Sequence, residues 1–307
     1  MLPERSRAGW VLVAPALTAI GLFFAVPVLA ALALSFTDFD LYALADLGRL
    51  RFVGAANYQR LVHDPRFWVA LRNTSYFVFV GGPLSVAVSL AAALALDSRA
   101  AAWKPFFRTV FVLPVVTTLV AVAVVWRYLY HPRVGLLNHV LGWLGVAPID
   151  WLGDPRFAMP AIIVLAIWKN FGFNTLIFLA GLQAIPPRLF EAARLDGAGA
   201  WQTFRAVTLP MLAPTFVLVA VLTLAGYFQL FAEPYVMTQG GPGSSTLSVV
   251  LLMYEQGFRW WNLGYAAAVA FVLFAIIAAF TALERLVRRF AVARGEGAPG
   301  HPAGEPS

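Results

Sequence analysis

The segment WVLVAPALTAIGLFFAVPVLAALALS, from Trp10 to Ser35, contains no charged residue. An α-helix of about 20 apolar residues spans the hydrocarbon core of a bilayer, so this segment predicts a transmembrane helix. Arg5 and Arg7 precede it, as basic residues precede the apolar core of a signal peptide, but that core is usually only about 7 to 15 residues long. The segment also lacks a small-x-small cleavage site before the polar region that follows, so we expect the helix to be retained.

Five further apolar segments of similar length follow along the chain, and together they predict six transmembrane helices. Prolines within them are compatible with membrane helices, because neighbouring helices can satisfy the carbonyl groups that proline leaves free. A closed β-barrel would need shorter segments of alternating polarity. The predicted fold class is therefore an all-α membrane protein with a six-helix bundle. The predicted spans are 10–35, 73–96, 106–130, 157–182, 213–236 and 263–283.

The composition agrees with a membrane protein, with 61% hydrophobic residues, 12% charged residues and a mean hydropathy of +0.76. The absence of cysteine excludes disulfides, thiolate metal sites and a cysteine nucleophile, and no other catalytic or metal-binding residues are predicted. The formal net charge is +7, but the basic residues flank apolar segments instead of forming a stripe with aromatic residues. We therefore expect membrane lipid, and not nucleic acid, to contact these basic residues.

Lysine and arginine are more frequent at one set of span ends, which by the positive-inside rule faces the cytoplasm. Both termini fall on this side when the chain has six spans. We expect a cytoplasmic head over residues 1–9, a transmembrane domain over 10–290 and a disordered cytoplasmic tail over 291–307, whose Gly, Pro and Glu supply little apolar surface. The basic residues on this side are Arg5, Arg7, Arg99, Lys104, Arg108, Arg188, Arg194, Arg205, Arg285, Arg288, Arg289 and Arg294.

The loop between the fourth and fifth spans, residues 187–214, reads PRLFEAARLDGAGAWQTFRAVTLPMLAP. Pro187 suits the start of a helix, and Gly197 suits a turn that requires a positive φ, so the loop predicts two short helices joined at a corner. The first helix presents small and charged residues that suit docking to another protein. A short amphipathic helix resting on the membrane surface fits the same spacing.

The order of residues in this loop is Glu-Ala-Ala, three residues, Gly, nine residues, Val, one residue and Leu-Pro. It resembles the signature loop of the permease subunits of bacterial ABC importers. The resemblance implies a six-helix permease bundle with a cytoplasmic coupling helix that docks on an ATPase subunit. The residues that it assigns to this coupling are Glu191, Ala192, Ala193, Asp196, Gly197, Ala198, Leu209 and Pro210.

Other segments resemble the carbohydrate branch of this family, namely Ala14-Pro15-Ala16, Asn57-Tyr58 and Thr238-Gln-Gly-Gly-Pro242. The resemblance implies a heterodimer with a second permease subunit, two ATPase subunits and an extracytoplasmic solute-binding protein, in a bacterial-type inner membrane. It also implies a carbohydrate substrate. This chain contains no Gly-x-x-x-x-Gly-Lys-Ser/Thr phosphate loop, so ATP and Mg are expected on the ATPase subunits, and this chain is expected to be no enzyme.

Lys169 lies within the fourth span, where a lysine costs about 2.5 to 3.5 kcal/mol unless it finds a partner or a wet cavity. Its neighbours combine aromatic rings with amides, a mixture that suits sugar recognition. Resemblance to maltose-type permeases implies a substrate site that includes these positions. The implied residues are Trp168, Lys169, Asn170 and Phe173 from the fourth span and Thr223, Gly226, Tyr227 and Leu230 from the fifth, with Gln229 and Glu233 as further candidates.

Structural roles for these residues remain open at the level of sequence. The aromatic residues could pack between helices, and Lys169 could form an ion pair with Glu233. A contact between Lys169 and an anionic substrate would favour a sugar phosphate. Three other functions also remain: an ion-coupled secondary transporter, which normally shows repeats and broken helices, a non-transporting membrane scaffold, and an ABC permease for amino acids or polyamines.

Overall fold

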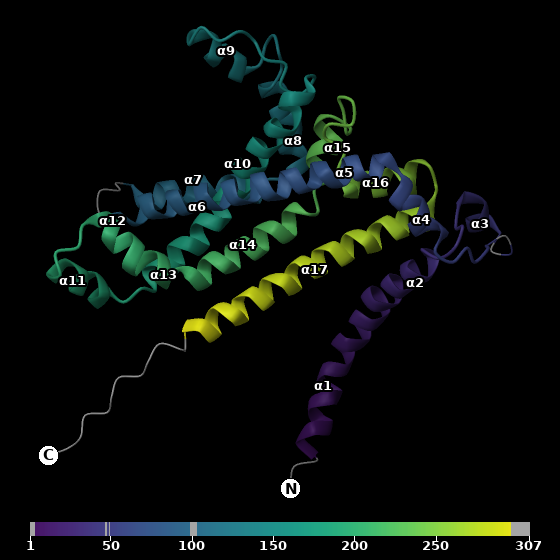
Figure 1. The fold of residues 1–307 in the computed structure, drawn as a ribbon, viewed down its shortest axis with the longest axis horizontal. Helices are drawn as coiled ribbons and strands as arrows, with labels where there is room; N and C mark the ends of the chain where they lie inside the picture. The colour runs from purple at the N-terminus through teal and green to yellow at the C-terminus, as the bar shows by residue number, and fades with distance from the viewer. Residues whose placement is uncertain (1–3, 47, 49, 99–102, 296–307) are drawn as a thin grey trace.

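The computed structural model describes residues 4–46, 48, 50–98 and 103–295, and these residues form helices joined by loops, with no strand among them (Figure 1). Four of the helical segments are long and apolar enough to cross a membrane, and the number rises to six when each of two bent helix pairs counts as one span. This agrees with the predicted six-helix bundle. The four unbroken segments are Gly9–Leu34, Pro65–Asp97, Pro155–Gln183 and Leu263–Ala282.

The first and second spans each contain one π-helical turn, at Gly21–Ala25 and Phe77–Gly81 respectively. The flanking α-helices continue through each turn as one membrane segment. The fourth and sixth spans have no such interruption. The α-helices of these spans are α1 (Glu4–Ile20), α2 (Val26–Leu34), α5 (Pro65–Tyr76), α6 (Gly82–Asp97), α10 (Pro155–Gln183) and α17 (Leu263–Gly295).

The third span, predicted as one helix over 106–130, is instead a pair of helices bent by 101°. Helix α7 (Lys104–Val116) ends three residues before α8 (Leu119–Leu129) begins, and Thr117 and Thr118 between them are extended. Hydrophobicity alone could not predict this bend. The free carbonyl groups at the end of α7 must find donors inside the protein, because hydrocarbon offers none.

The second bent pair joins the segment Ala200–Met211 to Ala213–Tyr227 at an angle of 66°. The fifth span, predicted as one helix over 213–236, is also interrupted near its other end. Helix α14 (Ala213–Tyr227) is followed by a short turn, after which α15 (Ala232–Met237) begins. Pro234 explains the break, because in a continuous helix its ring would clash with the carbonyl group four residues earlier, at Leu230. That carbonyl instead accepts a hydrogen bond of 2.5 Å from the Ser248 hydroxyl.

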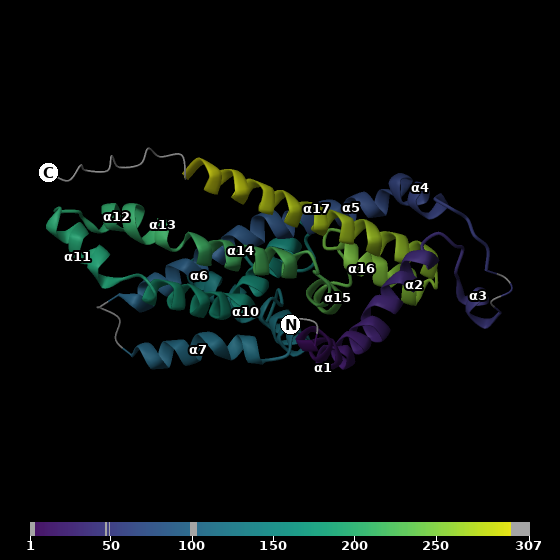
Figure 2. The ribbon, with the colours of Figure 1, turned by 90° about the horizontal axis from the view of Figure 1, so that it is seen from below.

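Helix α10 lies at the centre of the bundle and packs against α6, α7 and α14 (Figure 2). The packing against α7 is close at Gly172, where an added Cβ atom would overlap the Phe111 carbonyl. Helix α17 packs against α2, α4 (Ala56–His63) and α16 (Val249–Tyr254). Helix α1 diverges from the bundle, and none of the residues in the apolar window of its span is buried (Figure 1).

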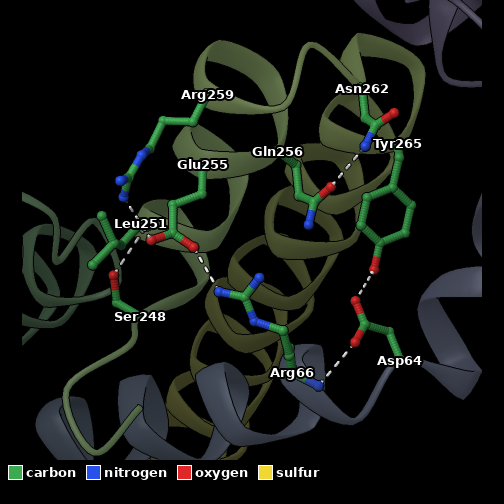
Figure 3. Close-up of polar contacts among 9 residues, drawn as sticks. All are labelled: Asp64, Arg66, Ser248, Leu251, Glu255, Gln256, Arg259, Asn262 and Tyr265. Carbon is green, nitrogen blue, oxygen red and sulfur yellow. Dashed lines mark hydrogen bonds and ion pairs between the residues drawn. The ribbon is translucent and has the colours of Figure 1, made fainter. Parts of the chain in front are cut away.

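Helix α16 forms a buried segment beside α5 and α17. A polar network joins these elements (Figure 3). Arg66 pairs at 2.6 Å with Glu255, which also lies 3.4 Å from Arg259. The Tyr265 hydroxyl donates to Asp64 at 2.7 Å. The ion pair between Arg66 and Glu255 links α5 to the segment after α16, and the hydrogen bond between Tyr265 and Asp64 links the start of α5 to α17.

Short helices make up the rest of the described chain. Near the first turn of α10, a hydrogen bond from the Arg156 side chain to Asp154 lowers the pKa of that carboxyl below its usual value. Helix α17 extends to Gly295, so it includes residues 291–295 of the predicted tail, while residues 1–3 of the predicted head and 296–307 of the tail lie outside the described residues. The short helices not yet given are α3 (Leu41–Ala45), α9 (Leu136–Trp143), α11 (Pro187–Leu195), α12 (Ala200–Thr203) and α13 (Leu209–Met211).

We expect the Gly172→Ala variant to be destabilised by about 1 to 3 kcal/mol, because its methyl group forces α7 away from α10. Thermal unfolding of the detergent-solubilised protein measures this effect. Gly142→Ala is the matched control, since an added Cβ atom there meets nothing within 4 Å. Equal melting temperatures for the Gly172→Ala variant and the wild type would contradict the close packing of these helices.

Candidate functional site

A cavity of about 420 Å³ lies beside the two interruptions of the bundle, between α10, the end of α14 and the start of α8. Its volume falls within the range of about 300 to 1,000 Å³ that is usual for small-molecule sites. Helix α10 contributes amide and aromatic side chains, and the turn between α14 and α15 closes one side. The lining residues are Phe77, Leu119, Asn170, Phe173, Asn174, Leu222, Thr223, Gly226, Tyr227, Gln229, Leu230, Phe231, Ala232 and Glu233.

The structure brings most of the sequence-derived substrate residues together around this cavity. Asn170 and Phe173 line it from α10, Thr223, Gly226 and Tyr227 line it from α14, and Leu230, Gln229 and Glu233 line it from the segment that follows. Trp168 and Lys169 are not among the lining residues. Phe77 and Leu119 line the cavity although nothing in their own segments distinguishes them from packing residues, so sequence reasoning missed them.

The amide groups of the cavity are held by hydrogen bonds within the protein. Asn170 Nδ2 donates to the Ala166 carbonyl at 2.9 Å, one helical turn earlier. Asn174 Nδ2 donates at 3.0 Å to the Thr223 hydroxyl, which joins α10 to α14 across the cavity wall. The Tyr227 ring packs against Phe77 with a centroid distance of 4.7 Å and an angle of 34° between the ring planes. These contacts fix the side chains before any ligand binds.

Lys169 points to the break between α7 and α8. Its Nζ donates at 2.6 Å to the Pro114 carbonyl and at 3.1 Å to the Val115 carbonyl. Thr117 also donates to the Pro114 carbonyl, at 2.7 Å. The lysine therefore satisfies carbonyl groups that the end of α7 leaves free. No ion pair within 4 Å joins Lys169 to Glu233 in the described chain, although the two charges attract each other.

Trp168 lies on a different surface, in an apolar groove between α7, α8 and α10. Its ring packs at 5.5 Å from that of Trp126 on α8. It is 39% exposed, so it contributes to the outer surface of the bend and not to the cavity. Trp168 and Asn170 are two residues apart on α10, so their side chains point about 200° apart around the helix.

The loop of residues 187–214 projects from the end of the bundle opposite α3 and α4 (Figures 1 and 2). Helix α11 ends in a Schellman motif, in which the Ala198 amide donates to the Ala193 carbonyl at 2.9 Å and the Gly197 amide donates to the Arg194 carbonyl at 3.0 Å. Gly197 has the expected positive φ, of 74°. The two predicted short helices and their corner are therefore present.

One side of the loop is attached to the bundle and the other is open. Leu189, Phe190 and Val207 pack against a core cluster of α6, α10 and the start of α14. Glu191, Ala192, Asp196 and Gly197 are exposed, as are Leu209 and Pro210 in α13, while Ala193 and Ala198 are half-buried. Leu195 is 89% exposed and Trp201 70% exposed, so the open side also presents apolar side chains. This arrangement suits a rigid contact with another protein.

A helical membrane bundle with a ligand-sized cavity and an exposed, firmly attached loop defines a transport subunit. Residues 85–292 match the family described as the inner membrane component of binding-protein-dependent transport systems, so the chain belongs to this family. Membership favours the interpretation as an ABC importer permease over an ion-coupled secondary transporter or a scaffold.

Several curated relatives resemble the chain over most of its length. The lactose transport system permease protein LacF of Rhizobium radiobacter is 36% identical over 90% of this chain and 92% of its own. The trehalose/maltose transport system permease protein MalF of Thermococcus litoralis is 33% identical over 94% of this chain and 95% of its own. A chain of the crystal structure of a bacterial alginate ABC transporter in complex with an alginate pentasaccharide-bound periplasmic protein shares the fold, with a TM-score of 0.78 and 20% identity over 92% of this chain and 96% of its own.

We expect Lys169→Met to destabilise the bundle by about 1 to 3 kcal/mol, because two carbonyl groups at the end of α7 lose a charged donor. Lys169→Arg should retain part of this stability. Thermal unfolding in detergent, with binding of a substrate measured in parallel, separates the structural role from a role in recognition.

Lys104→Met is the matched control, because the hydrogen bond that this side chain makes within the described residues is a long one, of 3.3 Å to the Asp97 carbonyl. A Lys169→Met protein with unchanged stability and lost substrate binding would show that the lysine serves the ligand instead.

Proposed function

We propose that the chain is a membrane-spanning permease subunit of an ATP-driven, binding-protein-dependent importer of sugars or related carbohydrates. The names of LacF and MalF, which refer to lactose and to trehalose and maltose transport, support a carbohydrate substrate. The cavity supports it too, because aromatic rings can stack on sugar rings and amides can bond to hydroxyl groups.

One observation carries this proposal: the exposed loop of residues 187–214 connects the two helices that line most of the cavity. Helix α10 reaches the loop at Gln183, and α14 leaves it at Ala213. Both helices line the cavity within their length. A displacement of the loop would therefore be transmitted directly through α10 and α14 to both walls of the cavity.

The partners follow from this geometry and from the family. Two ATPase subunits would hold ATP and Mg, and one of them would bind the loop through Glu191 and the neighbouring residues Ala192, Ala193, Asp196, Gly197, Ala198, Leu209 and Pro210. An extracytoplasmic binding protein would deliver the substrate, and a second, different permease subunit would complete the membrane part. The described part of α1 supports this last partner, because its apolar span is wholly unburied within its own chain.

Transport then proceeds by alternating access. ATP-driven closure of the ATPase subunits pulls the loop and opens the cavity to the outside, and hydrolysis returns it to the inside. Binding energy alone cannot accumulate substrate, because a ligand with equal affinity for two states shifts no equilibrium between them. The free energy comes from ATP on the partner subunits, and this chain performs no catalysis of its own.

Glu191→Ala should abolish ATP-dependent sugar uptake in cells or proteoliposomes, while the protein still reaches the membrane. Glu191 is exposed on the loop, where the ATPase subunit would dock, and its side chain has no hydrogen bond or ion pair within the described part of the chain, so its loss should affect docking and not the bundle. Uptake of labelled neutral sugars, glycerol phosphate and amino acids, with ATP depletion and a protonophore applied separately, measures the effect.

Asp97→Ala is the matched control, since Asp97 is an exposed acidic residue at the end of α6 outside the loop. Uptake by Glu191→Ala cells at the wild-type rate, or uptake that follows the proton gradient in place of ATP, would contradict the proposed coupling.

The proposed location is a bacterial-type inner membrane with both termini and the loop in the cytoplasm. Single cysteines test this orientation, because the chain has no natural cysteine. Leu195→Cys in α11 should react with a membrane-impermeant maleimide only in inverted vesicles, and Trp143→Cys in α9 only in intact cells or spheroplasts. Both positions are at least 75% exposed. The reverse labelling pattern would overturn the orientation.

A further inference from the structure

Four aromatic side chains form a continuous row that begins at the cavity wall and ends at an exposed position shortly before α17. Phe231 lines the cavity, and the centroid of its ring lies 5.3 Å from that of Tyr235 and 5.2 Å from that of Tyr254. The Tyr254 ring in turn lies 5.6 Å from the Phe258 ring. We call Phe231, Tyr235, Tyr254 and Phe258 the aromatic row.

The outer members of the aromatic row are exposed. Phe231 and Tyr254 are half-buried, whereas Tyr235 is 39% exposed and Phe258 is 63% exposed. The rings of Tyr254 and Phe258 are stacked with 30° between their planes. Each of these rings therefore covers one face of the other, and the second face of Phe258 stays open.

The segment that carries Phe258 is held in place by the polar network of Figure 3. Phe258 belongs to the π-helical turn Glu255–Arg259, which follows α16 directly. Glu255 of this turn pairs at 2.6 Å with Arg66 of α5. The Phe258 ring is thus positioned before a ligand binds, which lowers the entropic cost of binding.

A saccharide matches the aromatic row in both of its parts. A sugar ring has faces made of C–H groups and a rim of hydroxyl groups. Aromatic faces pack against such apolar faces, and the hydroxyl groups of Tyr235 and Tyr254 can donate to the rim or accept from it. The row therefore offers the two kinds of contact that a sugar ring requires.

Aromatic side chains near a membrane surface also serve as interfacial anchors, a role that suits the exposed Trp260 and Trp261 beside the row. Anchors lie around a bundle at the depth of the lipid headgroups and have no need to reach a cavity. The aromatic row instead continues inward to Phe231 at the cavity wall. This continuity favours a path for a ligand over a contact with lipid.

We propose that Tyr235, Tyr254 and Phe258 form an external saccharide subsite, on which a sugar ring stacks before it reaches Phe231 and the cavity. A saccharide of two or more rings contacts the subsite and the cavity together, whereas a single ring occupies them one after the other. A longer saccharide therefore gains more from the subsite. The inference deepens the proposed function and rests on it.

The test uses the complete transporter, with its partner subunits and binding protein, in proteoliposomes that are given ATP. The labelled probes are glucose, maltose and maltotriose, which differ only in their number of identical rings, with galactose and lactose as a second series. Uptake of each probe is expressed per assembled transporter, so that a loss of assembly is not counted as a loss of transport.

Phe258→Leu and Tyr254→Leu each replace a flat ring with an aliphatic side chain. Each should lower uptake of the longer probes about two- to tenfold, the usual effect of losing one aromatic contact, and should lower uptake of the one-ring probes less. Phe258→Trp keeps a flat ring, so it should recover most of the uptake that Phe258→Leu loses.

Phe52→Leu is the matched control, because Phe52 is an 80% exposed phenylalanine in the segment after the first span, outside the aromatic row. It should leave uptake of every probe unchanged. A Phe258→Leu transporter that loses one-ring and longer probes equally, or that performs as well as Phe258→Trp, would overturn the inference.

The wild type also tests the inference by its own choice of probes. A wild type that takes up only one-ring probes would overturn the external subsite and leave the proposed function intact. Absence of ATP-dependent uptake of any saccharide by the wild type would count against the proposed function itself, and the inference would fall with it.

Discussion

The bundle depends on one constraint: wherever a helix stops inside hydrocarbon, the protein must supply donors for the carbonyl groups that the helix leaves free. It meets this constraint at both interruptions. At the end of α7, Lys169 and Thr117 donate to the carbonyls of Pro114 and Val115. After α14, the Ser248 hydroxyl donates to the Leu230 carbonyl. Lys169 and Ser248 are distant in sequence from the carbonyl groups to which they donate, so the breaks are stable only within the assembled bundle.

These breaks also create the cavity. Leu119 lines it because α8 turns sharply away from α7, and residues 229–233 line it because the fifth span stops being helical. A bundle of six straight helices would fill this space with packed side chains. The substrate cavity and the satisfied helix ends are therefore two results of the same local geometry, and a change at Pro114 or Pro234 acts on both.

The sequence predicts the number of spans well. Each crossing of the membrane requires about 20 apolar residues, however the helices of the bundle pack against one another. The corner at Gly197 is also predictable, since only glycine readily adopts a positive φ. The bend in the third span and the break in the fifth were not predicted, because the mean hydropathy of an apolar segment is the same whether it forms one helix or two. Pro234 was a usable signal, since its ring excludes a helical carbonyl at Leu230.

The direction of each side chain was harder to predict than its position. Lys169 and Asn170 are neighbours, yet one serves the end of α7 and the other lines the cavity. The difference depends on the rotation of α10 against α7, two helices that approach closely at Gly172. A single sequence does not contain that angle. The contribution of Phe77 was hidden for the same reason, because its role depends on the ring of Tyr227 across the bundle.

Helix α1 lies outside the residues that match the family and buries none of its apolar window in the bundle. Most substitutions along such a helix leave the packing of its own subunit unchanged. Insertion of additional helices at this end would likewise leave the cavity and the loop undisturbed. The apolar surface of the first span is thus open to lipid or to another subunit without any change in the packing around the cavity.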